Sequence, residues 1–138
     1  CMLKFIPITA QAGIVGFESP AAEYTELGLS LDSLLIDKPA ATFIGYAQGK
    51  SMMDDGIHDG DLLIVSRAED ISDMCIIVAT LNGEFVCKRV DKRHGCLRSS
   101  SPLYKPYFLK EGDEFSIEGV VTRSIRLHKK LSRRLGGE

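Results

Sequence analysis

The chain has 138 residues, of which 44% are hydrophobic and 26% are charged, and its formal net charge at pH 7 is -2. This length allows one domain with a real core but not two ordinary domains, and the composition is typical of a soluble globular protein. The small net charge argues against a protein that binds nucleic acid through bulk charge.

Residues 1–20 contain Pro7, Gly13, Gly16 and Pro20 among short apolar patches without clear periodicity. This pattern predicts an extended, flexible N-terminal arm. Residues 21–35 have a partly helical pattern, because Ser19 and Pro20 form a typical helix start. Ser30 offers a second possible start. We expect helix only in this front part of the chain.

From residue 41 the pattern changes to short apolar runs separated by turns. Strands are predicted near 41–48, 61–66, 74–81, 84–90, 95–99 and 114–127. Asn82-Gly83 between two apolar runs is a strong hairpin signal, because both residue types tolerate a positive φ. The sequence therefore predicts a mostly-β domain over 21–138, of sandwich or partly closed barrel type, with little helix.

The four cysteines, at positions 1, 75, 87 and 96, show neither CxxC nor zinc-ligand spacing. We expect no metal and no cofactor. With no secretory signal and no long apolar segment, we expect a cytoplasmic protein without a membrane anchor. The segment 123–134 holds six basic residues and no acidic one. A solvated tail explains it, and a weak contact with DNA or an acidic partner is the alternative.

Lys88 and Ser51 are the candidate catalytic residues. Val86 and Val90 flank Lys88 on one face of a predicted strand, so its amine is either covered or at a sheet edge. If covered, the pKa of Lys88 falls, and a neutral lysine can activate a serine hydroxyl. Ser51 alone is weak evidence, because a turn serine more often bonds its own backbone. His58, His94 and His128 lie in turns or the tail and do not favour a Ser-His-Asp triad.

Several motifs in order resemble the self-cleaving serine peptidases of the LexA/UmuD family, over about residues 12–127. The central motifs are Gly49-Lys50-Ser51-Met52, Asp59-Gly60-Asp61-Leu62-Leu63-Ile64-Val65 and Gly83-Glu84-Phe85-Val86-Cys87-Lys88-Arg89. The segment Gly16-Phe17-Glu18-Ser19-Pro20-Ala21-Ala22-Glu23-Tyr24 resembles the UmuD branch in particular, as do 39–43 and 119–122. The resemblance implies a LexA/signal-peptidase-like β domain.

The resemblance also implies residue roles. Ser51 matches the nucleophile, Lys88 the general base, and the backbone amides of Lys50 and Ser51 the oxyanion hole. The substrate would be the chain's own arm, cut between a small residue and glycine. Ala12-Gly13 is the favoured bond, because a β-branched residue should fit the pocket poorly. Val15-Gly16 is the alternative, because Gly16-Phe17 has the better register with relatives.

The family's known biology implies an SOS mutagenesis protein. It would form a homodimer, cut its arm when stimulated by a RecA filament on single-stranded DNA, and then join a UmuC-type Y-family translesion polymerase. A LexA- or phage-type repressor would need a helix-turn-helix domain before the peptidase domain, where we find a short arm, so no sequence-specific DNA binding is expected. A signal peptidase would need a membrane anchor. A non-enzymatic β scaffold is the remaining alternative.

Overall fold

The computed structural model describes residues 3–5, 25–27 and 30–132, and the chain divides into two units, 1–37 and 38–138. In the first unit, β1 (Leu3–Phe5) pairs antiparallel with β2 (Thr25–Leu27). Helix α1 (Leu31–Leu35) follows Ser30, whose hydroxyl accepts a hydrogen bond from the Ser33 amide at 3.2 Å. The second predicted helix start is thus confirmed.

The helical interpretation of residues 25–27 is wrong, because these residues form a strand paired with β1. Backbone pairing with a distant segment overrides the weak local preference for helix there. The first predicted helix start, at Ser19 and Pro20, lies outside the described residues, as does most of the predicted arm.

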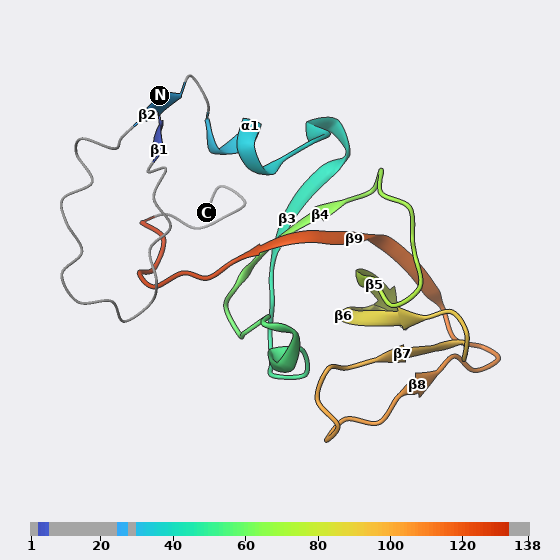
Figure 1. Ribbon diagram of the computed structural model, residues 1–138. Helices are drawn as coiled ribbons and strands as arrows, with labels where there is room; N and C mark the ends of the chain where they lie inside the picture. The colour runs from blue at the N-terminus through green and yellow to red at the C-terminus, as the bar shows by residue number, and fades with distance from the viewer. Residues whose placement is uncertain (1–2, 6–24, 28–29, 133–138) are drawn as a thin grey trace. The chain divides into compact units, whose positions relative to one another are not determined.

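The second unit is a seven-stranded antiparallel sheet, which confirms the predicted mostly-β fold (Figure 1). Two short 3-10 turns flank β3, the first strand of this sheet: η2 (Pro39–Ala41) precedes it and η3 (Met53–Asp55) follows it. The strands are β3 (Thr42–Tyr46), β4 (Leu62–Ser66), β5 (Ile76–Leu81), β6 (Glu84–Asp91), β7 (Cys96–Arg98), β8 (Tyr107–Phe108) and β9 (Phe115–Ile125). All but β8 were predicted.

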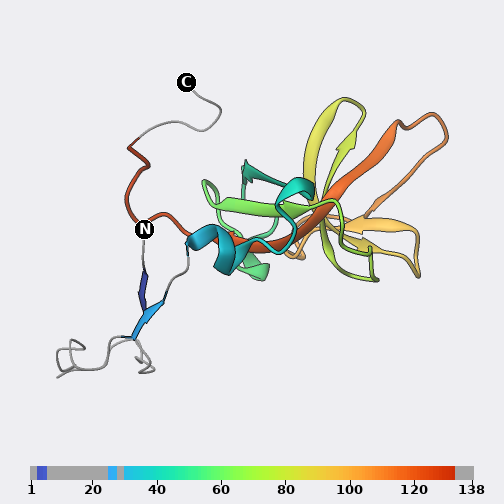
Figure 2. The ribbon, with the colours of Figure 1, turned by 90° about the horizontal axis from the view of Figure 1, so that it is seen from above.

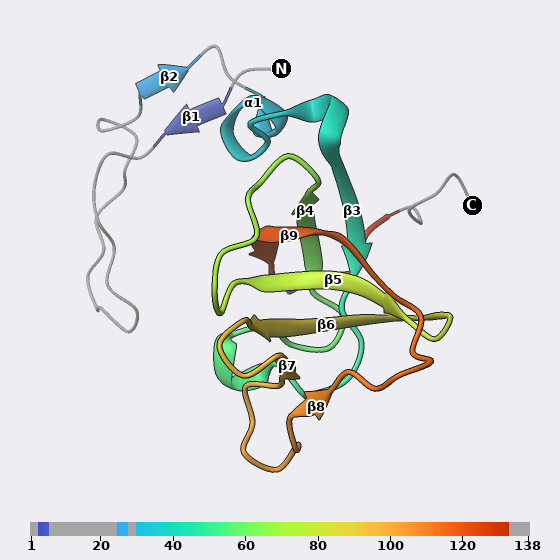
Figure 3. The same ribbon diagram turned by 90° about the vertical axis from the view of Figure 1, so that its right-hand side faces the viewer.

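The order of strands in the sheet is β3-β4-β9-β5-β6-β7-β8, so the last strand in sequence is inserted between β4 and β5. Figures 1 and 2 show β9 as one long curved strand. Its pairing skips Thr122 opposite β4 and Glu118 opposite β5. Such bulges bend a strand and increase its twist. In Figure 3, β3 and β4 accordingly run steeply while β5 and β6 lie side by side across the view.

Side chains of alternating strand positions fill two separate hydrophobic clusters. On β5, Ile77 and Ala79 are fully buried in one cluster, together with Leu97 and Val120. Ile76 and Val78 face the other cluster, whose buried members are Ala47, Met52, Ile57, Leu63 and Val65. Because Met52 directly follows Ser51, this second cluster anchors the segment that carries the candidate nucleophile.

The β5–β6 hairpin turns at Asn82 and Gly83, whose φ angles are 51° and 85°, as the sequence predicts for these residue types. The turn sets the register that places Lys88 opposite Ile77. β6 lies between β5 and β7, but its pairing with β7 covers only residues 89–91, so Lys88 itself pairs with β5 alone. Lys88 is half-buried and stands beside the end of β7, so it matches neither sequence alternative completely, the covered lysine or the lysine at a sheet edge.

Candidate active site

Ser51 lies in a turn between β3 and η3 that is fixed on both sides. Before it, Gly49 has a φ of +86° and its amide donates a hydrogen bond to the Asp59 carboxylate at 2.8 Å. A positive φ suits glycine because it has no side chain to clash. After it, Met52 is only 3% exposed. The serine is therefore held by a glycine turn on one side and by the core on the other.

The structure brings Ser51 and Lys88 together although they are 37 positions apart. The Lys88 Nζ atom donates a hydrogen bond to Ser51 Oγ at 3.0 Å. Burial lowers the pKa of the Lys88 ammonium from its usual value, and the neighbouring Cys87 thiol opposes this shift. A hydroxyl within hydrogen-bond reach of an amine with a lowered pKa has the geometry needed for proton transfer.

Three further serines, at positions 99, 100 and 101, contact this pair, and none of them was predicted. Ser99 Oγ accepts a second hydrogen bond from Lys88 Nζ, at 2.8 Å. The Ser100 amide and hydroxyl donate to the backbone oxygen of Ser51, at 3.0 and 3.2 Å. The sequence offered one signal, the run of three serines after β7. That run could be linked to the site only once the sheet had placed β7 beside β6.

The backbone amides of Lys50 and Ser51, the predicted oxyanion donors, make no hydrogen bond within residues 30–132. Both amides are thus free to bind an oxygen of a ligand. Free main-chain N–H groups beside a serine hydroxyl are the usual components of an oxyanion hole.

A cavity of about 160 Å³ opens beside the pair. Its walls include Ala47, Ser51, Val86 and Lys88, and the strongly exposed Phe85 stands at its side. Cys87 also lines it, and burial raises the pKa of that thiol to about 11. The cavity has room for a small side chain next to Ser51 Oγ.

An ion pair connects the two segments that carry Ser51 and Lys88. The guanidinium of Arg89, next to Lys88, binds the carboxylate of Asp55 through two hydrogen bonds of 2.9 and 2.8 Å. Asp55 ends η3, the turn that follows Ser51. A two-point contact of this kind fixes orientation as well as distance.

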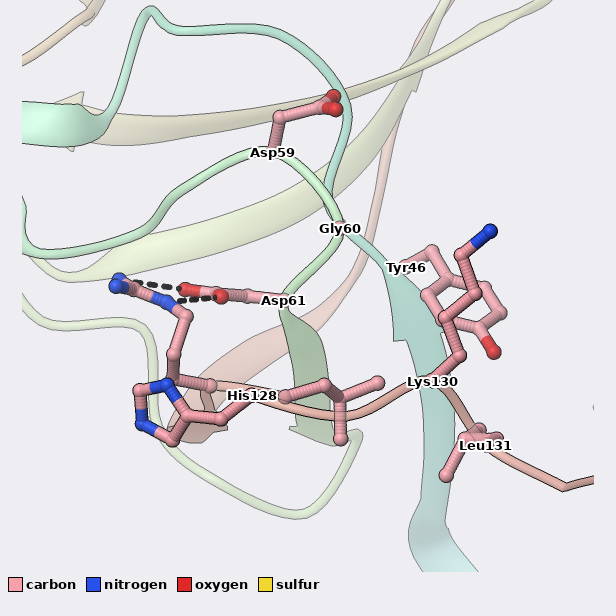
Figure 4. Close-up of a pocket in the computed structure, with 9 residues that line it drawn as sticks. Tyr46, Asp59, Gly60, Asp61, His128, Lys130 and Leu131 are labelled. Carbon is pink, nitrogen blue, oxygen red and sulfur yellow. Dashed lines mark hydrogen bonds and ion pairs between the residues drawn. The ribbon is translucent and has the colours of Figure 1, made fainter.

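A larger cavity, of about 420 Å³, lies elsewhere, at the end of β9 (Figure 4). There the carboxylate of Asp61, 1% exposed, pairs with Arg126 at 2.5 Å. Burial alone would raise the pKa of Asp61, but hydrogen bonds from Arg126 and from the His58 amide lower it overall. Two of the polar groups that line this cavity, Asp61 and Arg126, are thus already engaged with each other.

None of the three histidines lines the cavity beside Ser51. His94 Nδ1 contacts Asp91 at 2.8 Å, and His128 lines the larger cavity. Within the described part of the chain, no group of three or more His, Cys, Asp and Glu side chains could hold a metal ion. None of the helices in that part is long and apolar enough to cross a membrane.

The predicted cleavage residues Ala12, Gly13, Val15 and Gly16 lie outside the described residues.

Comparison with known proteins places the chain in a family. The sequence profile of the family described as Peptidase S24-like matches residues 5–122. The chain belongs to the peptidase S24-like family.

Relatives of this S24-like chain include Protein SamA of Salmonella typhimurium, which is 40% identical over 127 residues, or 91% of this chain and 87% of SamA. Protein MucA of Escherichia coli is 37% identical over 125 residues, or 89% of this chain and 86% of MucA. The LexA repressor of Bordetella avium is 36% identical over 121 residues, which are 84% of this chain and only 56% of the repressor. The predicted UmuD-like membership of the LexA/UmuD family is confirmed.

Proposed function

We propose that this chain is a UmuD-like serine endopeptidase that cuts its own N-terminal arm with Ser51 and Lys88. The observation that carries the proposal is the 3.0 Å hydrogen bond between Lys88 Nζ and Ser51 Oγ, made by a lysine whose pKa burial lowers. Membership of a peptidase family adds support.

The proposed reaction begins with a neutral Lys88, which takes the proton of Ser51 as its Oγ attacks the carbonyl carbon of the scissile bond. The amides of Lys50 and Ser51 stabilise the negative oxygen of the tetrahedral intermediate. The Lys88 ammonium then gives its proton to the leaving amide nitrogen, which frees the amine end of the shortened chain. Water, deprotonated by Lys88, hydrolyses the acyl-enzyme and restores the serine.

The substrate bond we favour is Ala12-Gly13. A cavity of about 160 Å³ beside Ser51 suits the alanine methyl, and one wall of this cavity is Val86. The branched side chain of Val15 in the alternative bond, Val15-Gly16, would be harder to place against that wall. Tethering a substrate to its own site gives it a high effective concentration, which compensates for a modest catalytic pair.

The cellular role we propose is SOS mutagenesis. A RecA filament on single-stranded DNA would stimulate cutting, and the trimmed homodimer would act with a UmuC-type translesion polymerase in the cytoplasm. The similarity to SamA and MucA, at 40% and 37% identity, supports this role. The peptidase domain of a LexA-type repressor, with the same chemistry, is the alternative, and operator binding by the intact protein would support it.

The test is incubation of the purified protein at neutral and alkaline pH, with mass spectrometry of the products. A new N-terminus at Gly13 is expected, whereas Gly16 would favour the alternative bond. Ser51→Ala and Lys88→Ala should each abolish cutting. Ser116→Ala and Lys92→Ala, the same changes at exposed positions, should cut normally. Continued cutting by either site variant would overturn the Ser-Lys mechanism.

Stimulation by RecA is tested separately, by adding RecA, ATP and single-stranded DNA at neutral pH. We expect faster cutting only when all three are present. An equal rate without the filament would contradict the proposed regulation but not the chemistry.

A further inference from the structure

Ser99 contacts Lys88 more closely than the candidate nucleophile does. Its Oγ lies 2.8 Å from Lys88 Nζ, against 3.0 Å for Ser51 Oγ. Ser99 follows β7, and residues 99–101 are half-buried. The amine of Lys88 therefore has two hydroxyl neighbours, only one of which is needed as a nucleophile.

The chain on both sides of Ser99 is fixed. On one side, Arg98 Nε donates to the buried carboxylate of Asp91 at 2.6 Å. On the other, the amides of Ser100 and Ser101 donate to the backbone oxygen of Ser51 at 3.0 and 3.4 Å. The backbone of Ser99 is thus held near Ser51 by its neighbours, independently of the bond between its hydroxyl and Lys88.

We propose that Ser99 is a positioning residue, whose hydroxyl accepts an N–H bond from Lys88 and thereby aims the lone pair of the amine at Ser51 Oγ. This inference rests on the proposed function. A neutral lysine amine has two N–H groups and one lone pair, and it rotates freely about its last carbon–nitrogen bond. A base works only when its lone pair faces the proton that it removes. An acceptor at 2.8 Å holds one N–H group away from Ser51 and leaves the lone pair free to face it.

The Ser99 hydroxyl has a second, opposite effect. By accepting a hydrogen bond from the charged amine it stabilises the ammonium, which works against the effect of burial on the pKa of Lys88. Removing the hydroxyl should therefore make Lys88 easier to deprotonate but less well oriented. A purely structural serine would not produce this combination.

The test is the self-cleavage rate of Ser99→Ala as a function of pH. We expect the plateau rate at alkaline pH to fall about 10- to 100-fold, the range for a misplaced catalytic group. We also expect the rise of the rate with pH to shift to lower pH. Ser99→Thr, which keeps the hydroxyl, should restore much of both properties, and the exposed Ser116→Ala should change neither.

A second measurement does not depend on cutting. The titration of Lys88 is followed by NMR in Ser51→Ala and in Ser51→Ala/Ser99→Ala, and the pKa of Lys88 should be lower in the double variant. An unchanged pKa, or a wild-type plateau rate in Ser99→Ala, would overturn the role of Ser99. Cutting by Ser51→Ala would instead refute the proposed function. If Ser99→Ala fails to fold, Ser99→Cys, similar in volume but a weak acceptor, replaces it in both measurements.

Discussion

The Arg89–Asp55 ion pair offers a sharp test of how the site is held, through the variant Asp55→Asn. The substitution keeps the size of the side chain, removes its charge and replaces one acceptor oxygen by an NH2 group. Arg89 therefore loses one of its two hydrogen bonds, of 2.8 and 2.9 Å, and the ionic part of the other. The arginine retains its contact with the backbone oxygen of Met74. The turn after Ser51 is then less firmly attached to the strand of Lys88.

The expected loss of stability follows from burial. The two side chains are 31% and 18% exposed, between the fully exposed and the fully buried case. Exposed pairs contribute about 0.2–1 kcal/mol, and breaking a fully buried pair costs about 3–5 kcal/mol. We therefore expect the free energy of unfolding to fall by about 1–2 kcal/mol.

Urea unfolding measures this change, and the matched control is Asp54→Asn, at the exposed neighbouring position of the same turn. The control should lie within about 0.5 kcal/mol of the wild type. Arg89→Met combined with Asp55→Asn should lose little more than the more damaging single variant, because the two residues share one interaction.

The self-cleavage rate of Asp55→Asn should fall about tenfold or more at a temperature where the variant is fully folded, because small displacements of catalytic groups are costly. Two results would refute the reasoning. Equal stability of Asp55→Asn and Asp54→Asn would mean that the pair contributes nothing. A normal cleavage rate in a destabilised Asp55→Asn would mean that the pair supports the fold but not the positions of Ser51 and Lys88.

Three other predictions concern the rest of the domain. Hydrogen bonds from Arg126 and from the His58 amide hold the pKa of Asp61 below its usual value, so this pairing stabilises the fold above about pH 4, and that stability is lost as the pH falls through the lowered pKa. Acid unfolding monitored by circular dichroism should be less steep in Asp61→Asn, and an unchanged acid unfolding curve would contradict this. Gly119→Ala should destabilise the protein by about 2 kcal/mol or more in urea, because a Cβ there would lie 2.7 Å from a valine carbon and 2.9 Å from a backbone oxygen. Gly45→Ala, with no atom within 4 Å of the added Cβ, is its control and should have little effect. Burial raises the pKa of Cys87 to about 11, so this thiol should be alkylated much more slowly in the native than in the unfolded protein. Rapid alkylation of the native protein, measured by mass spectrometry, would contradict this prediction.

The local features of the sheet were predictable because they depend on neighbouring residues. Asn82-Gly83 specifies a tight turn, and the apolar runs beside it specify strands, so the β5–β6 hairpin follows from the sequence. The two-residue strand β8 was missed. It follows Pro106 and is too short to show alternation, and only its pairing with β7 defines it.

The order of strands could not be predicted from local patterns. Whether β6 lies at an edge or inside the sheet depends on β7, which pairs with it through only three residues, all after Lys88. The same pairing brings Ser99 to the amine of Lys88. Ser51 and Lys88 themselves were found by resemblance, because a turn serine and a strand lysine are each common in proteins without catalytic roles. Their contact is a property of the sheet and not of either segment.

The insertion of β9 between β4 and β5 has a consequence for the order of events during protein synthesis. Ser51, Lys88 and Ser99 all precede β9 in the chain, yet the backbone pairing of β3 and β4 with β5 to β8 runs through β9. A nascent chain that has emerged only as far as residue 114 therefore contains every proposed catalytic group but not the strand through which this pairing runs. Under the proposed function, the arm, which emerges from the ribosome before the sheet, is protected from cutting until β9 has followed.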